Sequence, residues 1–328
     1  MPARPLDALA TVTIVALSVS WGLNQVAIKA ALPDIPPLIQ GVIRSSGALA
    51  MLLAWCAMRR VPLLSRDGSL LPGLVTGLLF GVEFVMIYRG LLMTSASRGT
   101  IFLYTAPLFV ALGGSFFLPG ERLGRLQWLG LVTAFVGVAV AIGVPHLLAP
   151  AAAGAAPAPA ATEASTLAGD ALLLVASVFW AATTLVVKGS RLVHVAPEKT
   201  LGYQLAVSIP ILGLAALVFG ETIAGVPRPA APGWLAYQTI WVVGITYGLW
   251  FTLVKHYSAS RLSAFTFLTP LFGVLAGHVV LGDAIDWPFA VAAALVVAGL
   301  VLVNRPRRGN PPAGTTMPAP PAGTNESR

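Results

Sequence analysis

Residues 95–109 read SASRGTIFLYTAPLF, and residues 258–272 read SASRLSAFTFLTPLF. The two stretches are identical at 8 of 15 positions and begin 163 residues apart. Another pair of residues, Trp21 and Lys29, recurs at the same spacing as Trp180 and Lys188. Self-similarity of this kind is typical of an internally duplicated chain. We therefore expect two copies of one structural unit.

The composition places most of this chain in lipid. Of its 328 residues, 57% are hydrophobic and 10% are charged, whereas a soluble domain carries about 25% charged residues. The net charge is +8, but lysines and arginines are scattered between apolar runs. That distribution argues against nucleic acid as a partner. The single cysteine, Cys56, leaves no disulfide within the chain.

Ten apolar runs are long enough to cross a membrane, which takes roughly 20 residues per helix. They cover about 8–31, 37–58, 70–92, 97–118, 126–144, 169–190, 198–219, 233–255, 261–281 and 286–303. We therefore expect an all-α integral membrane protein of about ten transmembrane helices, with five-helix repeats at 8–144 and 169–304. The Ala/Pro-rich run 149–168, within the linker 145–168, and the tail 305–328 are expected to be disordered.

Five is an odd number, so the two repeats enter the membrane from opposite sides. Inverted repeats are typical of secondary transporters, in which one site near the midplane is exposed alternately to each side. A duplicated membrane scaffold without transport is the alternative from another class of protein.

The positive charges predict the orientation of the chain. With the N-terminus in the cytoplasm, 15 lysines and arginines fall in cytoplasmic segments and 4 in outer segments. We therefore expect a multi-pass protein of the cell inner membrane with both termini in the cytoplasm. The linker 145–168, which contains no Lys or Arg, is then extracytoplasmic.

Residues 21–44, WGLNQVAIKAALPDIPPLIQGVIR, combine Trp-Gly-x-Asn, a nearby Lys, a Pro-Pro turn and a following Arg. This segment resembles the opening of the ten-helix EamA-type branch of the drug/metabolite transporter superfamily, and both SASR…PLF segments match the same family. The resemblance covers about residues 8–304. It implies a secondary transporter, most often an exporter of amino acids or related metabolites. The small multidrug branch carries a proton-exchanging carboxylate in its first helix, whereas similar positions here look like Trp21 and Trp180.

Glu83 is the one carboxylate well inside an expected span, where a charge costs about 2.5–3.5 kcal/mol. Arg44 in the second span is its expected partner, because both lie at a similar depth. They form either a static ion pair, a binding pair for a zwitterion or a proton-coupled switch. The repeat counterpart of Glu83 is Thr246, so this acid exists in one repeat only.

The first helix of each repeat carries a Trp followed by two polar residues on one helical face. These residues are Trp21, Asn24 and Gln25, and then Trp180, Thr183 and Thr184. They either bond to neighbouring helices or line a wet cavity, and their occurrence in both repeats favours the cavity. Further candidates for a substrate cavity are Tyr104, Tyr203, Gln204 and Tyr247.

Pro107 and Pro270 occupy matching positions within their spans. Each removes one backbone donor, so we expect two kinks that are either hinges or static bends. Small residues four apart in the fifth and tenth spans favour close packing within a monomer. Histidines are scattered, and no nucleophile–base pair or phosphate loop occurs, so we expect no metal site, no cofactor and no enzyme activity.

Together these features predict a transporter that exports amino acids or related small metabolites by alternating access. Its expected partners are a small-molecule substrate and the lipid bilayer. An uptake carrier or a broad-specificity drug carrier of the same fold, and the non-transporting scaffold, remain open.

Overall fold

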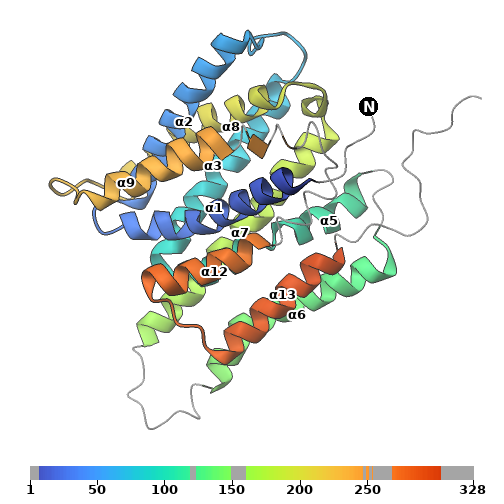
Figure 1. Ribbon diagram of the computed structural model, residues 1–328, viewed down its shortest axis with the longest axis vertical. Helices are drawn as coiled ribbons and strands as arrows, with labels where there is room; N and C mark the ends of the chain where they lie inside the picture. The colour runs from blue at the N-terminus through green and yellow to red at the C-terminus, as the bar shows by residue number, and fades with distance from the viewer. Residues whose placement is uncertain are drawn as a thin grey trace, which may run out of the picture.

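The computed structural model describes residues 7–118, 123–148, 160–246, 249–250, 253 and 268–303. Within these ranges every regular element is a helix, as predicted (Figure 1). The first repeat contains α1 (Ala8–Ala31), α2 (Pro37–Arg59), α3 (Leu70–Met93), α4 (Ala96–Leu103), α5 (Ala106–Phe117) and α6 (Arg125–Leu148). The second contains α7 (Ala160–Gly189), η2 (Arg191–His194), α8 (Pro197–Val218), α9 (Ala230–Ala236), η3 (Tyr237–Ile245), α12 (Leu268–Leu281) and α13 (Trp287–Val303).

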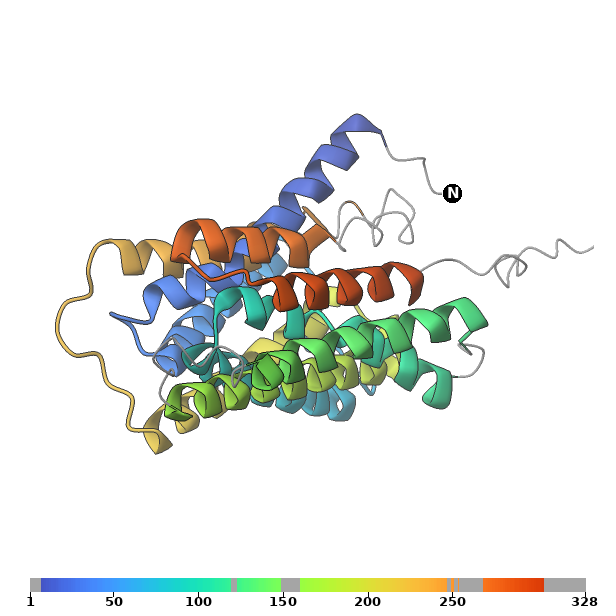
Figure 2. The ribbon, with the colours of Figure 1, turned by 90° about the horizontal axis from the view of Figure 1, so that it is seen from below.

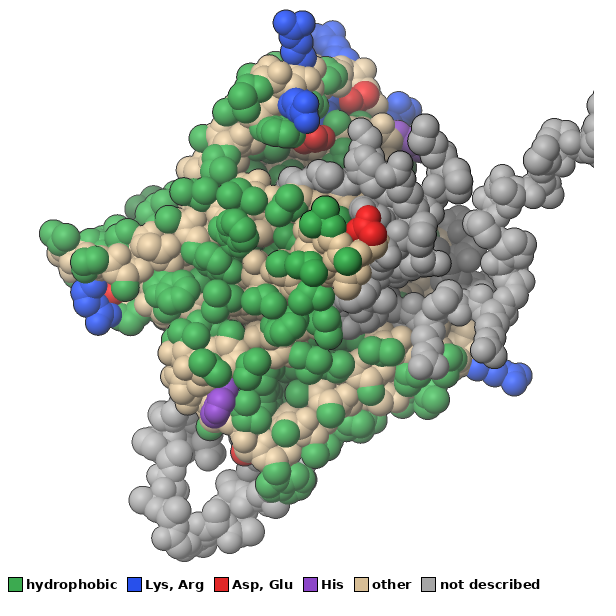
Figure 3. Space-filling model, viewed as in Figure 1, with side chains coloured by type: hydrophobic (Ala, Val, Ile, Leu, Met, Phe, Trp, Pro, Cys, Tyr) green, Lys and Arg blue, Asp and Glu red, His purple; other side chains and the backbone are tan. Residues whose placement is uncertain are grey.

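Among the described residues, six helices are long and apolar enough to cross a membrane. They are Ala8–Ala31, Pro37–Arg59, Leu70–Met93, Ala96–Phe117, Ser165–Gly189 and Pro197–Val218. Shorter apolar helices are Arg125–Ala141, Leu268–Leu281 and Trp287–Val303. These nine correspond to nine of the ten predicted spans, and α9 with the π-helical η3 forms the first part of the remaining one. Hydrophobic side chains cover the middle of the face in Figure 3, with most charged ones at its margins, as expected for lipid contact.

The closest helix contacts join one repeat to the other. α2 packs on α8 and α6 packs on α13, so that each lies against its repeat counterpart. α3 packs on α7 and α8, while α1 packs on α12. Figures 1 and 2 both show α6 and α13 side by side. The core is therefore built between two interlocked repeats, which fits the predicted inverted-repeat design.

Glycines allow the backbones of α6 and α13 to touch. A Cβ atom added to Gly299 would lie 2.5 Å from the Gly130 carbonyl oxygen and 2.5 Å from the Ala134 Cβ. A Cβ on Gly137 would lie 2.8 Å from the Ala292 carbonyl oxygen. Such small-residue contacts are how helices approach closely in lipid, where no hydrophobic force drives them together. The small-residue faces of α6 and α13, which are the fifth and tenth predicted spans, thus pack against each other within the chain.

The fourth span is interrupted rather than continuous. α4 ends at Leu103, and the Thr105 amide donates to the Phe102 carbonyl at 3.2 Å before α5 begins. Pro107 stands in the first turn of α5, where its missing N–H leaves no helical bond unmade. Pro270 is the third described residue of α12, and the residues directly before Leu268 lie outside the described ranges. The hinge role of both prolines stays a prediction.

The helix α7 begins at Ala160, nine residues before the predicted start at 169. It starts directly after Pro159, and its first turns are rich in Ala, the best helix former. The predicted disorder of 149–159 and of the tail from 305 concerns residues outside the described ranges.

A polar contact ties the loop between α2 and α3 to the start of α8. Lys199 donates to the Asp67 carboxylate at 2.8 Å and to the Ser65 carbonyl at 2.7 Å. The hydrogen bond from Lys199, with smaller help from Ser69, holds the pKa of Asp67 well below its usual range. Lys199 is buried although it is a lysine, because these bonds satisfy its charge.

Candidate functional site

A cavity of about 500 Å³ lies between the two repeats. The first repeat contributes residues of α1, α2, α3 and the junction of α4 with α5, and the second contributes residues of α7, α8, η3, α12 and α13. This volume falls in the range of small-molecule sites, which is about 300–1,000 Å³. The duplicated architecture therefore encloses a space that is large enough for a metabolite.

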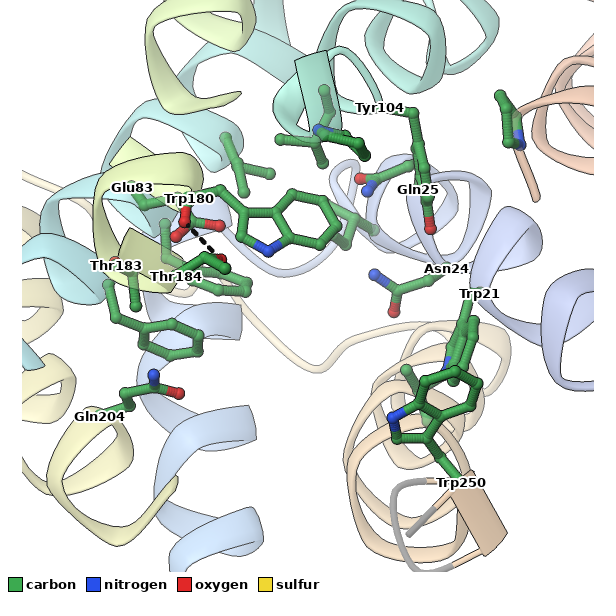
Figure 4. A pocket seen from close by; sticks show the side chains of 18 of the residues that line it. Trp21, Asn24, Gln25, Glu83, Tyr104, Trp180, Thr183, Thr184, Gln204 and Trp250 are labelled. Carbon is green, nitrogen blue, oxygen red and sulfur yellow. Dashed lines mark hydrogen bonds between the residues drawn. The ribbon is translucent and has the colours of Figure 1, made fainter. Parts of the chain in front are cut away.

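The structure brings ten of the twelve predicted cavity residues together around this space. They are Trp21, Asn24, Gln25, Arg44, Glu83, Tyr104, Trp180, Thr183, Thr184 and Gln204. Both predicted hinge prolines, Pro107 and Pro270, also line it. Figure 4 shows Asn24 and Gln25 on one side and Trp180, Glu83 and Thr184 on the other.

Tyr203 does not line the cavity, in contrast to the prediction. Its hydroxyl lies 3.2 Å from the Ser69 hydroxyl, and its ring packs where a Cβ on Gly73 would stand. The Tyr203 side chain therefore packs between α8 and α3. Tyr247, the remaining predicted residue, lies outside the described residues.

Aromatic pairs form two walls of the cavity. Trp21 and Trp250 meet edge to face with ring centroids 5.6 Å apart, and Tyr104 and Trp180 do so at 5.8 Å. The indole N–H of Trp21 donates to the Thr246 hydroxyl at 2.9 Å. These contacts fix the rings, so their faces form a preformed apolar surface.

The walls preserve the internal symmetry of the sequence. Trp21 bonds to Thr246, and their repeat counterparts Trp180 and Glu83 both line the cavity (Figure 4). On the axis between the repeats, the Ser208 hydroxyl donates to the hydroxyl of Ser45, 163 positions earlier, at 3.3 Å. Two residues that are 163 positions apart, the repeat offset of the sequence, thus meet in the structure.

Arg44 and Glu83 are buried charges that do not meet. Arg44 is 6% exposed and Glu83 is 4% exposed. The Arg44 Nε and Nη1 atoms have no hydrogen-bond partner, and its guanidinium lies 4.4 Å from the centre of the Phe84 ring. The charge of Arg44 acts on Glu83, but at a longer range than an ion pair. The direct pair expected from their similar depth is therefore not formed.

Three further polar atoms around the cavity lack partners: Asn24 Oδ1, Gln25 Oε1 and Thr183 Oγ1. Buried polar groups are nearly always hydrogen-bonded, and each unpaired one costs about 1–3 kcal/mol. Their concentration at one cavity favours a polar ligand that satisfies them. The arrangement can therefore bind a polar solute.

Sequence reasoning missed several lining residues, among them Trp250, Phe80 and Lys188. Lys188 was recognised only as a mark of the repeat. Trp250 lies within the predicted span 233–255, whose polar pattern is weak, and membrane tryptophans usually anchor at the interface. The internal duplication did not point to Trp250 either, because its counterpart at the offset of 163 residues is Ile87.

A network of polar residues closes one end of the bundle. Arg98 pairs with both carboxylate oxygens of Asp170, its Nη2 donates to the Ala141 carbonyl at 3.0 Å, and the Thr94 hydroxyl donates to Asp170 at 2.7 Å. Lys29 donates to the Thr94 carbonyl. We call Lys29, Thr94, Arg98 and Asp170 the Asp170 network.

The cavity does not reach this network but extends toward the opposite end. None of the network residues lines it, whereas Lys188 in the last turn of α7 does. Asp170 and Lys188 lie 18 residues apart on this one helix, or about 27 Å at 1.5 Å per residue. The bundle is thus closed at one end, and the cavity lies toward the other.

Two interlocked helical repeats with a cavity between them define a membrane transporter fold. The pattern of the EamA-like transporter family matches residues 8–143 and 167–305, one copy per repeat, and the chain belongs to this family. The predicted resemblance is therefore confirmed.

Relatives support this assignment across most of the chain. An uncharacterized transporter, sll0355, of Synechocystis is 26% identical, with 89% of both chains covered. A probable amino-acid metabolite efflux pump of Salmonella typhimurium is 24% identical, with 87% of this chain and 91% of the pump covered. A solved crystal structure of 23% identity matches with a TM-score of 0.60, over 90% of this chain and 96% of that one. This last likeness shows the fold.

Proposed function

We propose that this chain is a secondary transporter that exports amino acids or related small metabolites across the cell inner membrane by alternating access. The observation that carries the proposal is the cavity of about 500 Å³ between the repeats, with unpartnered polar atoms around it. A passive scaffold gains nothing from such atoms, since each one weakens the fold. A carrier needs them, because they replace the water that its solute loses on binding.

The position of the cavity along the bundle supports export. The distribution of Lys and Arg predicts that the Lys188 end faces the cytoplasm. The cavity extends toward that end, and the Asp170 network closes the other. This arrangement suits a state that receives its solute from the cytoplasm.

The chemistry of the walls supports a metabolite with an apolar part and a charged head. The indole faces come from Trp21, Trp180 and Trp250, and the ionisable groups are Arg44, Glu83 and, toward the cytoplasmic end, Lys188. The Salmonella typhimurium relative carries the name of a probable amino-acid metabolite efflux pump. We extend that solute class to this chain as part of the proposal, with no catalytic step.

Flux measurements in proteoliposomes test the proposal. Vesicles loaded with a mixture of labelled amino acids should release at least one of them faster than protein-free vesicles. Asn24→Leu keeps approximate bulk but removes the polar atoms, so release should drop several-fold while the melting temperature is nearly unchanged. Tyr203→Phe, which lies away from the cavity, should transport like the unaltered protein.

The alternatives give other results in the same assay. A scaffold releases no labelled solute. A broad-specificity drug carrier, which the aromatic walls would also suit, releases lipophilic cations in preference to amino acids. An uptake carrier accumulates solute when the vesicles carry the protein in its cellular orientation.

A further inference from the structure

We propose that Arg44 binds the carboxylate of the transported solute and that Glu83 binds its ammonium group. These two residues then select zwitterions against solutes that carry a single charge. The inference rests on the proposed transport function and adds to it the identity of the residues that determine charge selectivity.

Arg44 needs an anion that the described structure does not supply. An arginine side chain always carries its charge in proteins and offers five N–H donors. At 6% exposure, it has two nitrogens without a partner; the Phe84 ring lies over its guanidinium, and the neighbouring Tyr88 hydroxyl offers a hydrogen bond but no negative charge. Breaking or omitting the partner of a buried charge is strongly unfavourable. A carboxylate in the cavity would accept two parallel bonds from the guanidinium, which is the strongest pairing available to it.

Glu83 is the matching group for a cation: an isolated buried carboxyl group can take up a proton, and an ammonium group beside it favours the charged carboxylate. Glu83 is 4% exposed, lines the cavity with Trp180, and forms no hydrogen bond or ion pair with the described residues. The Asn24 and Gln25 carbonyl oxygens face the same space without a donor. An ammonium group carries three donors, so it can use the carboxylate together with such oxygens.

The two charges are near each other but not in contact, which suits a solute that carries both. Arg44 stands over the ring of Phe84, the residue directly after Glu83. A zwitterion of the α-amino acid type bears its opposite charges on neighbouring atoms, so it can bridge this pair. A cationic solute would pair with Glu83 and leave the charge of Arg44 uncompensated, and an anionic solute would pair with Arg44 and leave Glu83 without a partner.

Both charges belong to the first repeat. At the offset of 163, the counterpart of Arg44 is Val207 and the counterpart of Glu83 is Thr246. The Ser45–Ser208 contact shows that this offset holds in space one residue away from Arg44. Because Arg44 and Glu83 both come from the first repeat, the head group of the solute is held on that repeat in one orientation.

Charge-deleted solutes and variants test the assignment together. Proteoliposomes are loaded with the 20 amino acids to find one that is released. Its amide, which is a cation, and its deaminated acid, which is an anion, are then measured beside it. The unaltered protein should favour the zwitterion at least tenfold over both. Arg44→Gln should lose zwitterion flux and shift the preference toward the amide, while Glu83→Gln should shift it toward the deaminated acid.

Conservative and remote variants separate binding from folding. Arg44→Lys and Glu83→Asp keep the charges, so they should keep the preference for the zwitterion at reduced flux. Arg59→Gln makes the same chemical change at an exposed position of α2 and should behave as the unaltered protein does. These variants are compared at equal amounts of folded protein, as judged by melting temperature and elution from a sizing column.

Each result decides between the claims. If the unaltered protein releases no amino acid, the proposed function fails and this inference fails with it. If it releases one but the ratios among zwitterion, amide and acid are the same in Arg44→Gln, Glu83→Gln and the unaltered protein, transport stands and the charge assignment is overturned. Opposite shifts in the two Gln variants support the assignment, because a structural role predicts equal loss for all three solutes.

Discussion

The Asp170 network offers a direct measure of how one end of the bundle is held closed. Asp170 is fully buried and Arg98 is 17% exposed in its side chain, and the pair connects α7 to α4. Asp170→Asn keeps the shape of the side chain but removes its charge. Arg98 is then left with a buried, uncompensated guanidinium, which typically costs about 3–5 kcal/mol.

The neighbouring bond provides a graded comparison. Thr94→Val removes one hydrogen bond to the carboxylate, a loss of about 1.5–3 kcal/mol for a charged acceptor. Arg98→Gln combined with Asp170→Asn removes both charges and should cost less than the sum of the single changes. The free energy of unfolding is measured by titrating purified protein in micelles with a denaturing detergent, with circular dichroism as the signal.

A small effect would refute this reasoning. If Asp170→Asn lowers the free energy of unfolding by less than about 1 kcal/mol, the pair behaves like an exposed ion pair. If the Arg98 and Asp170 losses add without a coupling term, the two side chains do not hold each other in the folded protein.

Three further outcomes are expected. A cysteine replacing Ala155, in a Cys56→Ala background, should react with an impermeant thiol reagent in intact cells; labelling only after lysis would reverse the predicted orientation. Asp67→Asn should be destabilising near neutral pH. Because the folded-state pKa is lowered, the stabilisation is fully present above the unfolded value of about 3.9 and is lost progressively as pH falls from there through the folded-state pKa, so the difference between variant and parent should shrink below about pH 4 without vanishing by about pH 3. Gly299→Leu should separate α6 from α13 and lower the melting temperature, whereas the same change at Gly213, which has open space around it, should not.

The two repeats could be predicted because similar segments occur twice in the sequence. The matching segments at 95 and 258 gave an offset of 163 residues that the Ser45–Ser208 contact reproduces in space. The polar stripe from Trp21 to Gln25 also predicted the cavity wall correctly in position. Polar side chains in an apolar span have few places to go other than the interior, so their location follows from composition.

The contacts of individual side chains could not be predicted in the same way. Depth along a helix placed Arg44 and Glu83 at one level, but helix rotation decides whether two such groups touch, and here they do not. Tyr203 has the composition of a cavity residue, yet the absence of a side chain on Gly73 created room for it elsewhere. The start of α7 was missed because an Ala-rich run reads equally well as linker or as helix.

The packing of α2 on α8 and of α6 on α13 has a consequence for how the chain came to differ between its halves. Each helix lies against its own counterpart, the contact that two separate, identical half-length chains would make across a twofold axis. Two identical halves would each carry every charge. A second buried carboxylate would then stand at position 246 in addition to Glu83. Joining the halves in one polypeptide removes that constraint. The first repeat can then carry Glu83 alone, while the corresponding position of the second repeat holds Thr246, which accepts a hydrogen bond from Trp21.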